Sequence, residues 1–246
     1  MDRPFPVQFD SGVPPDVLEV ALEFQSAISD VGREGVQEVM GAFARLGARG
    51  ALAGHAKNPG DSRITLADTR LAEREGYWLF QDALLDPASV CVLLNMVHYV
   101  HLEDASITRA RIAWSGIRRL PDPMAIRFPP RWPALSFELV IGELLDDIDV
   151  TVRFRQPQDE TTIKRVVDAM SAWLLATHRG AYADDSFDPS KTAVFLGPDV
   201  MNLSPERVIW FIEVLRCNES ALDGLVNVLE WVHQRVAPIS QVEMGP

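Results

Sequence analysis

The sequence has very few cysteines and no long apolar stretch. Its 246 residues include only Cys91 and Cys217, which are too few for a disulfide scaffold. No apolar run reaches the roughly 18 residues that suggest a membrane span, and the opening MDRPFPVQFD lacks the basic and apolar regions of a signal peptide. We therefore expect a soluble cytoplasmic protein with reduced, structural cysteines.

Basic residues are also scarce. The chain has 23 lysines and arginines against 35 aspartates and glutamates, which gives a formal net charge of -12. Only three of the basic residues are lysines, a composition associated with high-GC bacterial genomes. The negative field repels nucleic acid and anionic membranes but attracts basic proteins. We expect a bacterial protein with a basic protein partner, and neither nucleic acid nor a membrane as partner.

Motifs of catalysis and nucleotide binding are missing as well. The chain contains no GxGxxG, GxxxxGKS/T or GxSxG pattern, and neither cysteine has an identifiable base beside it. No cofactor and no catalytic residue are predicted. These absences favour a protein that is not an enzyme.

What the sequence does contain is an internal repeat. Residues 77–113 align without a gap with residues 209–245, an offset of 132, and the front of each copy aligns at an offset of 130. Identical pairs in this alignment include Trp78/Trp210, Asn95/Asn227, Val100/Val232, His101/His233 and, at the front, Met40/Met170. Two segments that agree in order and spacing predict a tandem duplication.

Periodicity gives each copy the same order of elements. Leu18–Phe24 and Ile148–Phe154 alternate apolar and polar residues as strands do, and residues 31–47 and 160–177 have apolar residues at helical spacing and end toward a glycine. The remaining predicted elements are two β-rich segments per copy, a second helix after a capping residue, and a final strand: Arg63–Ala67, Gly76–Leu84, a helix after Asp86, Ile107–Trp114; Thr192–Gly197, Val208–Cys217, a helix after Asn218, Ile239–Met244.

This order predicts an α+β fold in which a ferredoxin-like β-α-β-β-α-β module occurs twice with pseudo-two-fold symmetry. Residues 1–114 form the first module and residues 136–246 the second, joined by a proline-rich crossover at 115–135. An additional strand precedes each module, at Pro6–Phe9 and Ser136–Ile141, and is expected to form a hairpin with the module's first strand. The two sheets are expected to pack face to face or to form one continuous sheet.

The repeated second helix contains the candidate binding residues. An amide and an aromatic residue lie four positions apart, hence on one helical face, and a histidine follows in each copy. These residues either line a groove for a ligand or partner, or pack the modules together while each histidine's charge suits the helix C-terminus. The candidates are Asn95, Tyr99 and His101 with Asn227, Trp231 and His233.

A metal site is not predicted. His98 and His101 are three residues apart, and Glu230 and His233 take the same positions in the second copy. This spacing differs from the HExxH helix, and no third ligand is placed by spacing.

Two functions remain open. The acidic charge and the missing catalytic motifs favour a non-enzymatic protein-binding protein, most concretely a bacterial inhibitor or immunity-type protein that neutralises a basic partner such as a toxin. It should present carboxylates around a few exposed apolar residues. The alternative is a small-molecule-binding protein or enzyme that uses a cleft between the two modules.

Overall fold

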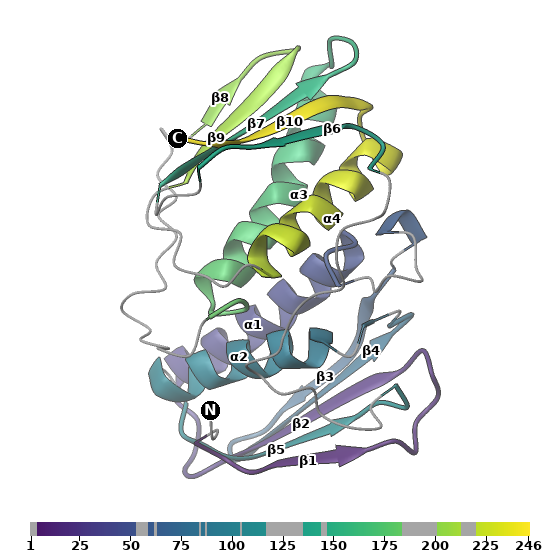
Figure 1. Ribbon diagram of the computed structural model, residues 1–246. Helices are drawn as coiled ribbons and strands as arrows, with labels where there is room; N and C mark the ends of the chain where they lie inside the picture. Colours follow the sequence, from purple (N-terminus) through teal and green to yellow (C-terminus); the bar gives the residue numbers. More distant parts are fainter. Residues whose placement is uncertain are drawn as a thin grey trace.

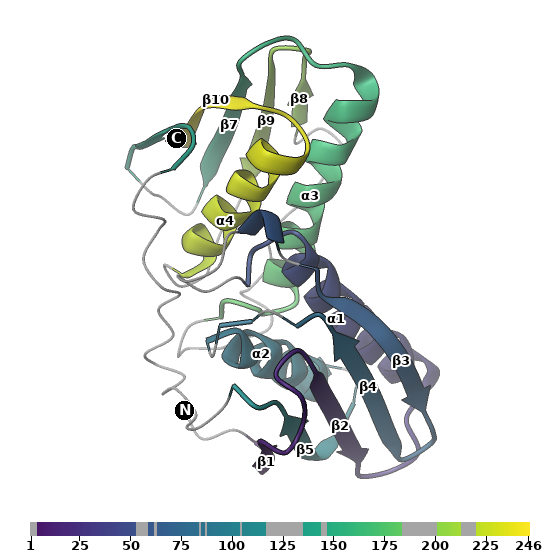
Figure 2. The same cartoon turned by 90° about the vertical axis from the view of Figure 1, so that its right-hand side faces the viewer.

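The computed structural model describes residues 4–52, 59–61, 63–83, 85–86, 88–103, 105–116, 135–143, 147–183, 201–212 and 220–246. Within these residues the chain forms two five-stranded sheets and four α-helices, which confirms the predicted α+β class. Both Figure 1 and Figure 2 show the sheets on the outside of the molecule and the helices between them. No helix in the described part is both long and apolar enough to cross a membrane.

The first half of the chain builds one sheet and two helices. Its strand order is β1-β5-β2-β4-β3, and the only parallel pair in it is β1 with β5. In chain order the elements are β1 (Val7–Asp10), β2 (Leu18–Phe24), α1 (Asp30–Ala48), the short 3-10 helix η1 (Pro59–Asp61), β3 (Thr65–Leu71), β4 (Glu75–Gln81), α2 (Ala88–Glu103) and β5 (Ile107–Ala113).

The second half has the same arrangement. Its strand order is β6-β10-β7-β9-β8, with β6 parallel to β10. The elements are β6 (Glu138–Ile141), β7 (Ile148–Phe154), α3 (Glu160–His178), β8 (Met201–Leu203), β9 (Arg207–Ile212), α4 (Ser220–Arg235) and β10 (Ile239–Gly245). The strand registers also agree: Val20 pairs with Trp78 and Ile112, and Val150 pairs with Trp210 and Met244. Positions with the same place in the two registers are called counterparts below.

Local chemistry explains where the helices begin and end. The Ser29 hydroxyl accepts a hydrogen bond from the Gly32 amide at the start of α1, and the Asp159 carboxylate does the same for Thr162 at the start of α3. After these helices, Gly50 and Gly180 adopt φ of 79° and 76°, a conformation that costs glycine little. Asp86 caps the start of α2 by accepting from the Ala88 amide, as the sequence predicts.

Each sheet packs its inner face on its own helices. In the first half, Trp78 and Phe80 of β4 are completely buried, and the Phe80 ring meets the Phe43 ring of α1 edge to face at 5.6 Å. Helix α2 is buried along most of its length because it lies between its own sheet and the rest of the molecule. The outer face of each sheet is turned away from all four helices (Figure 2).

Two predictions about the sheets are wrong. The additional strands β1 and β6 do not form hairpins with β2 and β7; each is an edge strand parallel to the last strand of its half. The sheets neither pack face to face nor merge into one, because the helices of the two halves contact each other between them.

The second sheet has its short edge strand, β8, at Met201–Leu203. The predicted strand at Thr192–Gly197 lies outside the described residues, as do Asn218 and most of the predicted crossover at 115–135.

Candidate protein-binding surface

All six predicted binding residues lie on the helices α2 and α4, and three of them contact the other half of the chain. Asn95 donates its side-chain amide to the Ala181 carbonyl at 3.2 Å. The Arg179 guanidinium lies 5.6 Å from the Tyr99 ring centre, and the Arg49 guanidinium lies 4.9 Å from the Trp231 ring centre. The fourth, Asn227, is buried on α4. These positions agree with the packing role that the sequence left open.

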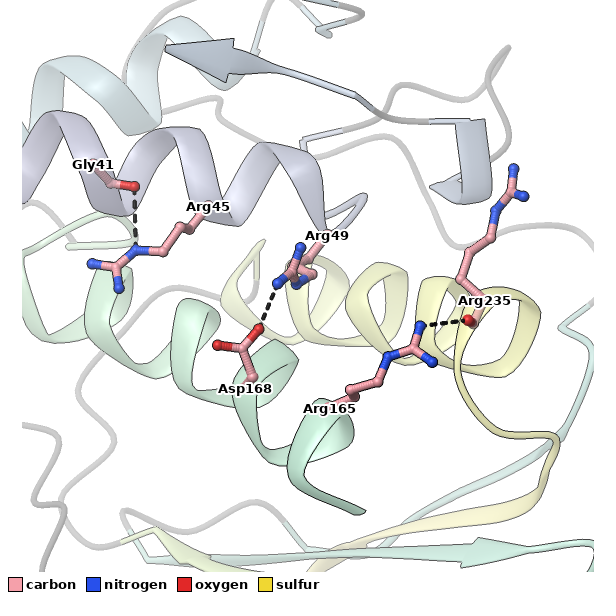
Figure 3. Close-up of polar contacts among 6 residues, drawn as sticks. All are labelled: Gly41, Arg45, Arg49, Arg165, Asp168 and Arg235. Atoms are coloured by element: carbon pink, nitrogen blue, oxygen red, sulfur yellow. Dashed lines mark hydrogen bonds and ion pairs between the residues drawn. The ribbon is translucent and has the colours of Figure 1, made fainter. Parts of the chain in front are cut away.

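The same arginines form ion pairs across the boundary. Arg49 of the first half binds Asp168 of α3 at 2.5 Å, as Figure 3 shows, and Arg179 of the second half binds Glu38 of α1. Arg49 and Arg179 are related by the 130-residue offset of the repeat, and so are Glu38 and Asp168. The boundary between the halves therefore uses one contact pattern twice.

Arg235 at the end of α4 connects the second half to the first. Arg165 of α3 donates to the Arg235 carbonyl at the end of α4, at 3.1 Å (Figure 3). The Arg235 side chain then reaches Asp61 of η1 in the first half, at 3.3 Å. Tyr99 itself is buried, and burial raises the pKa of its hydroxyl, with a further contribution from the hydrogen bond to Glu103.

The remaining two candidates, His101 and His233, hold the start of the last strand in each half. The His101 Nδ1 atom accepts a hydrogen bond from the Ile107 amide, and the His233 Nδ1 atom accepts one from the Ile239 amide, both at 3.0 Å. Each histidine side chain therefore satisfies a backbone amide at the point where the last strand of its half begins.

The histidine pairs considered for a metal have other contacts. The rings of His98 and His101 lie 6.4 Å apart, with the Phe5 ring packed against both. The Glu230 carboxylate accepts hydrogen bonds from the Ser136 amide at 3.1 Å and the Ser136 hydroxyl at 2.5 Å. Among the described residues no group of three or more metal-ligating side chains occurs.

We expect acid to destabilise the fold through His101 and His178. Burial lowers the pKa of both rings below the ordinary value of 6.5, and for His178 the neighbouring Arg179 charge adds to the effect. The neutral ring is favoured in the folded chain, so the stabilisation is complete above the unfolded pKa and is lost as pH falls below it. Denaturant unfolding between about pH 7.5 and 5.5 measures this loss.

The matching control is the pair of variants His101→Gln and His178→Gln. Each removes one titrating ring, so the free energy of unfolding should fall less steeply with pH than in the parent protein. An unchanged slope in both variants would show that neither ring is responsible.

The second sheet has an outer surface of exposed apolar and acidic residues that the sequence did not single out. On its outer face, Phe211 and Val140 are 36% and 42% exposed, and Ile209 is half-buried. Register places Asp149 directly opposite Phe211 and places Glu243 between Val140 and Thr151. The acidic–apolar patch is defined as Val140, Glu143, Asp147, Asp149, Ile209, Phe211 and Glu243.

Three of the acidic residues on this face lie together at one end of the sheet. Asp149 and the residues before it in the chain, Glu143 and Asp147, lie at the end of the sheet where β7 begins. The arginines Arg153 and Arg207 pair with each other in the register of β7 and β9, four residues further along β7. Register therefore places the Asp149 carboxylate beside exposed Phe211, whereas Arg153 lies further along the strands, where it binds Glu243 of the patch at 3.4 Å.

The fold defines a mixed α+β protein with two five-stranded sheets around four helices. No family model and no curated protein matches the chain. Three solved structures align with it at TM-scores of 0.23, 0.21 and 0.20, which are too low to support any argument about fold or function.

The first of these structures is the regulatory subunit of aspartate kinase from Thermus thermophilus, with 11% identity over 88% of this chain and 93% of that chain. The second is a protease from Helicobacter pylori, with 10% identity over 93% of this chain and 77% of that chain. The third is a predicted insulinase family protease from Yersinia pestis, with 11% identity over 91% of this chain and 69% of that chain.

Proposed function

We propose that the chain is a tandem duplication of a ferredoxin-like module with pseudo-two-fold symmetry. The β-α-β-β-α-β order occurs in both halves after an additional edge strand, and the strand registers agree residue by residue. Paired details support the same origin: the caps at Ser29 and Asp159, the glycines Gly50 and Gly180, and the histidine acceptors described above.

The proposed function is binding of a basic protein, as a bacterial inhibitor or immunity-type protein that neutralises a partner such as a toxin. The observation that carries it is the acidic–apolar patch, in which exposed Phe211 lies opposite Asp149 at the end of the second sheet where β7 begins, and the described outward residues at that end include no arginine. Carboxylates steer a cationic surface toward the patch, and a central aromatic residue supplies most of the affinity once water is excluded.

The shared fold supplies a matched control for this surface. Leu79 and Glu19 of the first sheet are the counterparts of Phe211 and Asp149, and they pair with each other in the same register. A substitution at these two positions therefore changes the same kind of outward-facing pair on the other face. Any general effect on the fold should appear in both variants, whereas a loss of binding should appear in only one.

We expect the double variant Phe211→Ser/Asp149→Asn to bind its partner at least about tenfold more weakly, because removal of an interfacial aromatic anchor commonly costs about 2 kcal/mol or more. The test immobilises the purified protein, captures proteins from its native lysate at about 0.1 M and 1 M salt, and measures the Kd of each captured protein. The control Leu79→Ser/Glu19→Gln should retain the parent affinity. Capture of no basic protein, or equal binding by both variants, contradicts the proposal.

A further inference from the structure

The outer face of the first sheet is hollowed into a groove of about 420 Å³, within the size range of small-molecule sites. Register places Ala21 between Arg111 on one side and Tyr77 on the other, with Arg70 beside Tyr77 and Gln8 beside Arg111. The short alanine side chain makes the floor, and the longer side chains make the walls. A second, smaller hollow bordered by Ala21, Tyr77 and Arg111 continues the groove toward Ala113.

Carboxylates hold the two arginines of the groove wall in place. Arg111 binds Asp10 at 3.0 Å, and Arg109, which lies two residues earlier on the same face, binds Glu23 at 3.2 Å. Each of these ion pairs uses one of the five N–H donors of a guanidinium group. The other donors of Arg109 and Arg111 are available to an anion that enters the groove, and their direction is already restrained by the carboxylates.

The aromatic wall is also fixed. The Arg70 guanidinium lies 5.7 Å from the centre of the Tyr77 ring, and Arg70 is itself bound to Asp68 at 2.7 Å. The Tyr77 hydroxyl interacts with Glu19, while burial is the main reason that its pKa is raised. The ring therefore presents an apolar surface beside Ala21.

The second sheet provides an internal comparison. At the counterpart positions of Arg70, Arg109 and Arg111 it has Asn202, Gln241 and Glu243, and at those of Gln8, Ala21 and Tyr77 it has Val140, Thr151 and Ile209. The second sheet thus adopts the same register with none of the three arginines, so the fold does not require them. Their concentration around one hollow needs another explanation.

We propose that this groove binds a small organic anion whose acidic group lies on Arg109 and Arg111 and whose planar or apolar body lies on Ala21 and Tyr77. Two adjacent guanidinium groups suit a carboxylate or a phosphate, since both accept paired N–H donors. Glu23 and Glu75 border the same groove on the side of Arg109, so the acidic group lies closer to Arg111 than to Arg109. This site is on the other sheet from the acidic–apolar patch, and it is independent of the proposed protein partner.

The test is isothermal titration calorimetry with four probes: phenyl phosphate, benzoate, inorganic phosphate and benzyl alcohol. We expect phenyl phosphate or benzoate to bind with a Kd below about 1 mM, which corresponds to about 4 kcal/mol. The tighter of the two identifies the acid that the groove prefers. Inorganic phosphate and benzyl alcohol should each bind at least about tenfold more weakly, because each probe supplies only half of the contacts.

The double variant Arg109→Gln/Arg111→Gln should weaken binding of the better probe at least about tenfold, because charge-assisted hydrogen bonds are lost. The matched control is Arg153→Gln/Arg207→Gln on the outer face of the second sheet, which should bind as the parent does. Both variants alter exposed arginines, so little loss of stability is expected, and thermal unfolding checks it. The proposal is overturned if neither aromatic anion binds with a Kd below about 1 mM, or if the two variants bind equally.

Discussion

Replacing Trp173 with alanine should lower the free energy of unfolding by about 3–5 kcal/mol, as is usual when a buried tryptophan is truncated. Trp173 lies on α3, its side chain is completely buried, and its indole N–H donates to the Ala221 carbonyl of α4 at 2.9 Å. Truncation leaves a cavity between the two helices and removes the partner of a buried carbonyl. Denaturant unfolding of the variant and the parent protein measures the difference.

A milder variant separates the two causes. The residue of the first half that corresponds to Trp173 by the 130-residue offset is the buried Phe43. The same place in the fold therefore accepts a phenyl ring. Trp173→Phe keeps most of the apolar volume but loses the hydrogen bond, and we expect it to cost about 1–3 kcal/mol.

Trp210 is the control for the hydrogen bond. It is also almost fully buried, but its indole nitrogen has no hydrogen-bond partner among the described residues. Trp210→Phe removes a buried donor that makes no bond, so it should cost less than Trp173→Phe. Equal costs for the two phenylalanine variants would show that cavity formation alone determines both losses.

Much of the secondary structure follows from the sequence because the periodicity appears twice. The alternation in Leu18–Phe24 and Ile148–Phe154 predicts strands at the bounds that β2 and β7 have. Helices α1 and α3 likewise agree within one residue with the predicted ranges 31–47 and 160–177 at both ends. A pattern that recurs in a second copy is less often a coincidence, which is why these elements were predictable.

The partner of the additional strand was not predictable in the same way. The residues of β1 indicate a short strand, but nothing in Val7–Asp10 specifies whether β2 or β5 is its neighbour. The hairpin prediction follows from nearness in sequence. In the sheet, however, β2 is already paired on both sides, by β4 and β5, whereas β5 is an edge strand of the four strands β5-β2-β4-β3. Edge pairing depends on which backbone groups remain free after the core sheet forms, and that is a tertiary property.

The position of α2 between two layers could have been predicted from the sequence. Residues 88–100 of α2 are apolar almost all round, and every one of them except Asn95 is buried. A helix that is apolar on all sides is covered on all sides, so it belongs between two layers. The acidic–apolar patch left no such signal, because Val208–Ile212 are all apolar and only the sheet register shows that Phe211 faces outward.

The two ion pairs between the halves, Arg179–Glu38 and Arg49–Asp168, should have unequal coupling energies. The Arg179 and Glu38 side chains are 19% and 37% exposed, whereas those of Arg49 and Asp168 are 29% and 60% exposed. Water screens the second pair more strongly, so a double-mutant cycle should give a larger coupling energy for Arg179–Glu38, about 1–2 kcal/mol, than for Arg49–Asp168, about 0.5 kcal/mol.

The single substitution Arg179→Ala should lower the free energy of unfolding by about 1–3 kcal/mol, because it removes the ion pair and also the cation over the Tyr99 ring. Arg49→Ala is the matched variant and should cost less, although its guanidinium lies closer to an aromatic ring, at 4.9 Å from Trp231. If Arg49→Ala proves the more costly of the two, aromatic stacking rather than ion pairing dominates the contact between the halves. The cycle with Asp168→Ala and Glu38→Ala then decides between these terms, because those variants change the ion pairs and leave both rings in place.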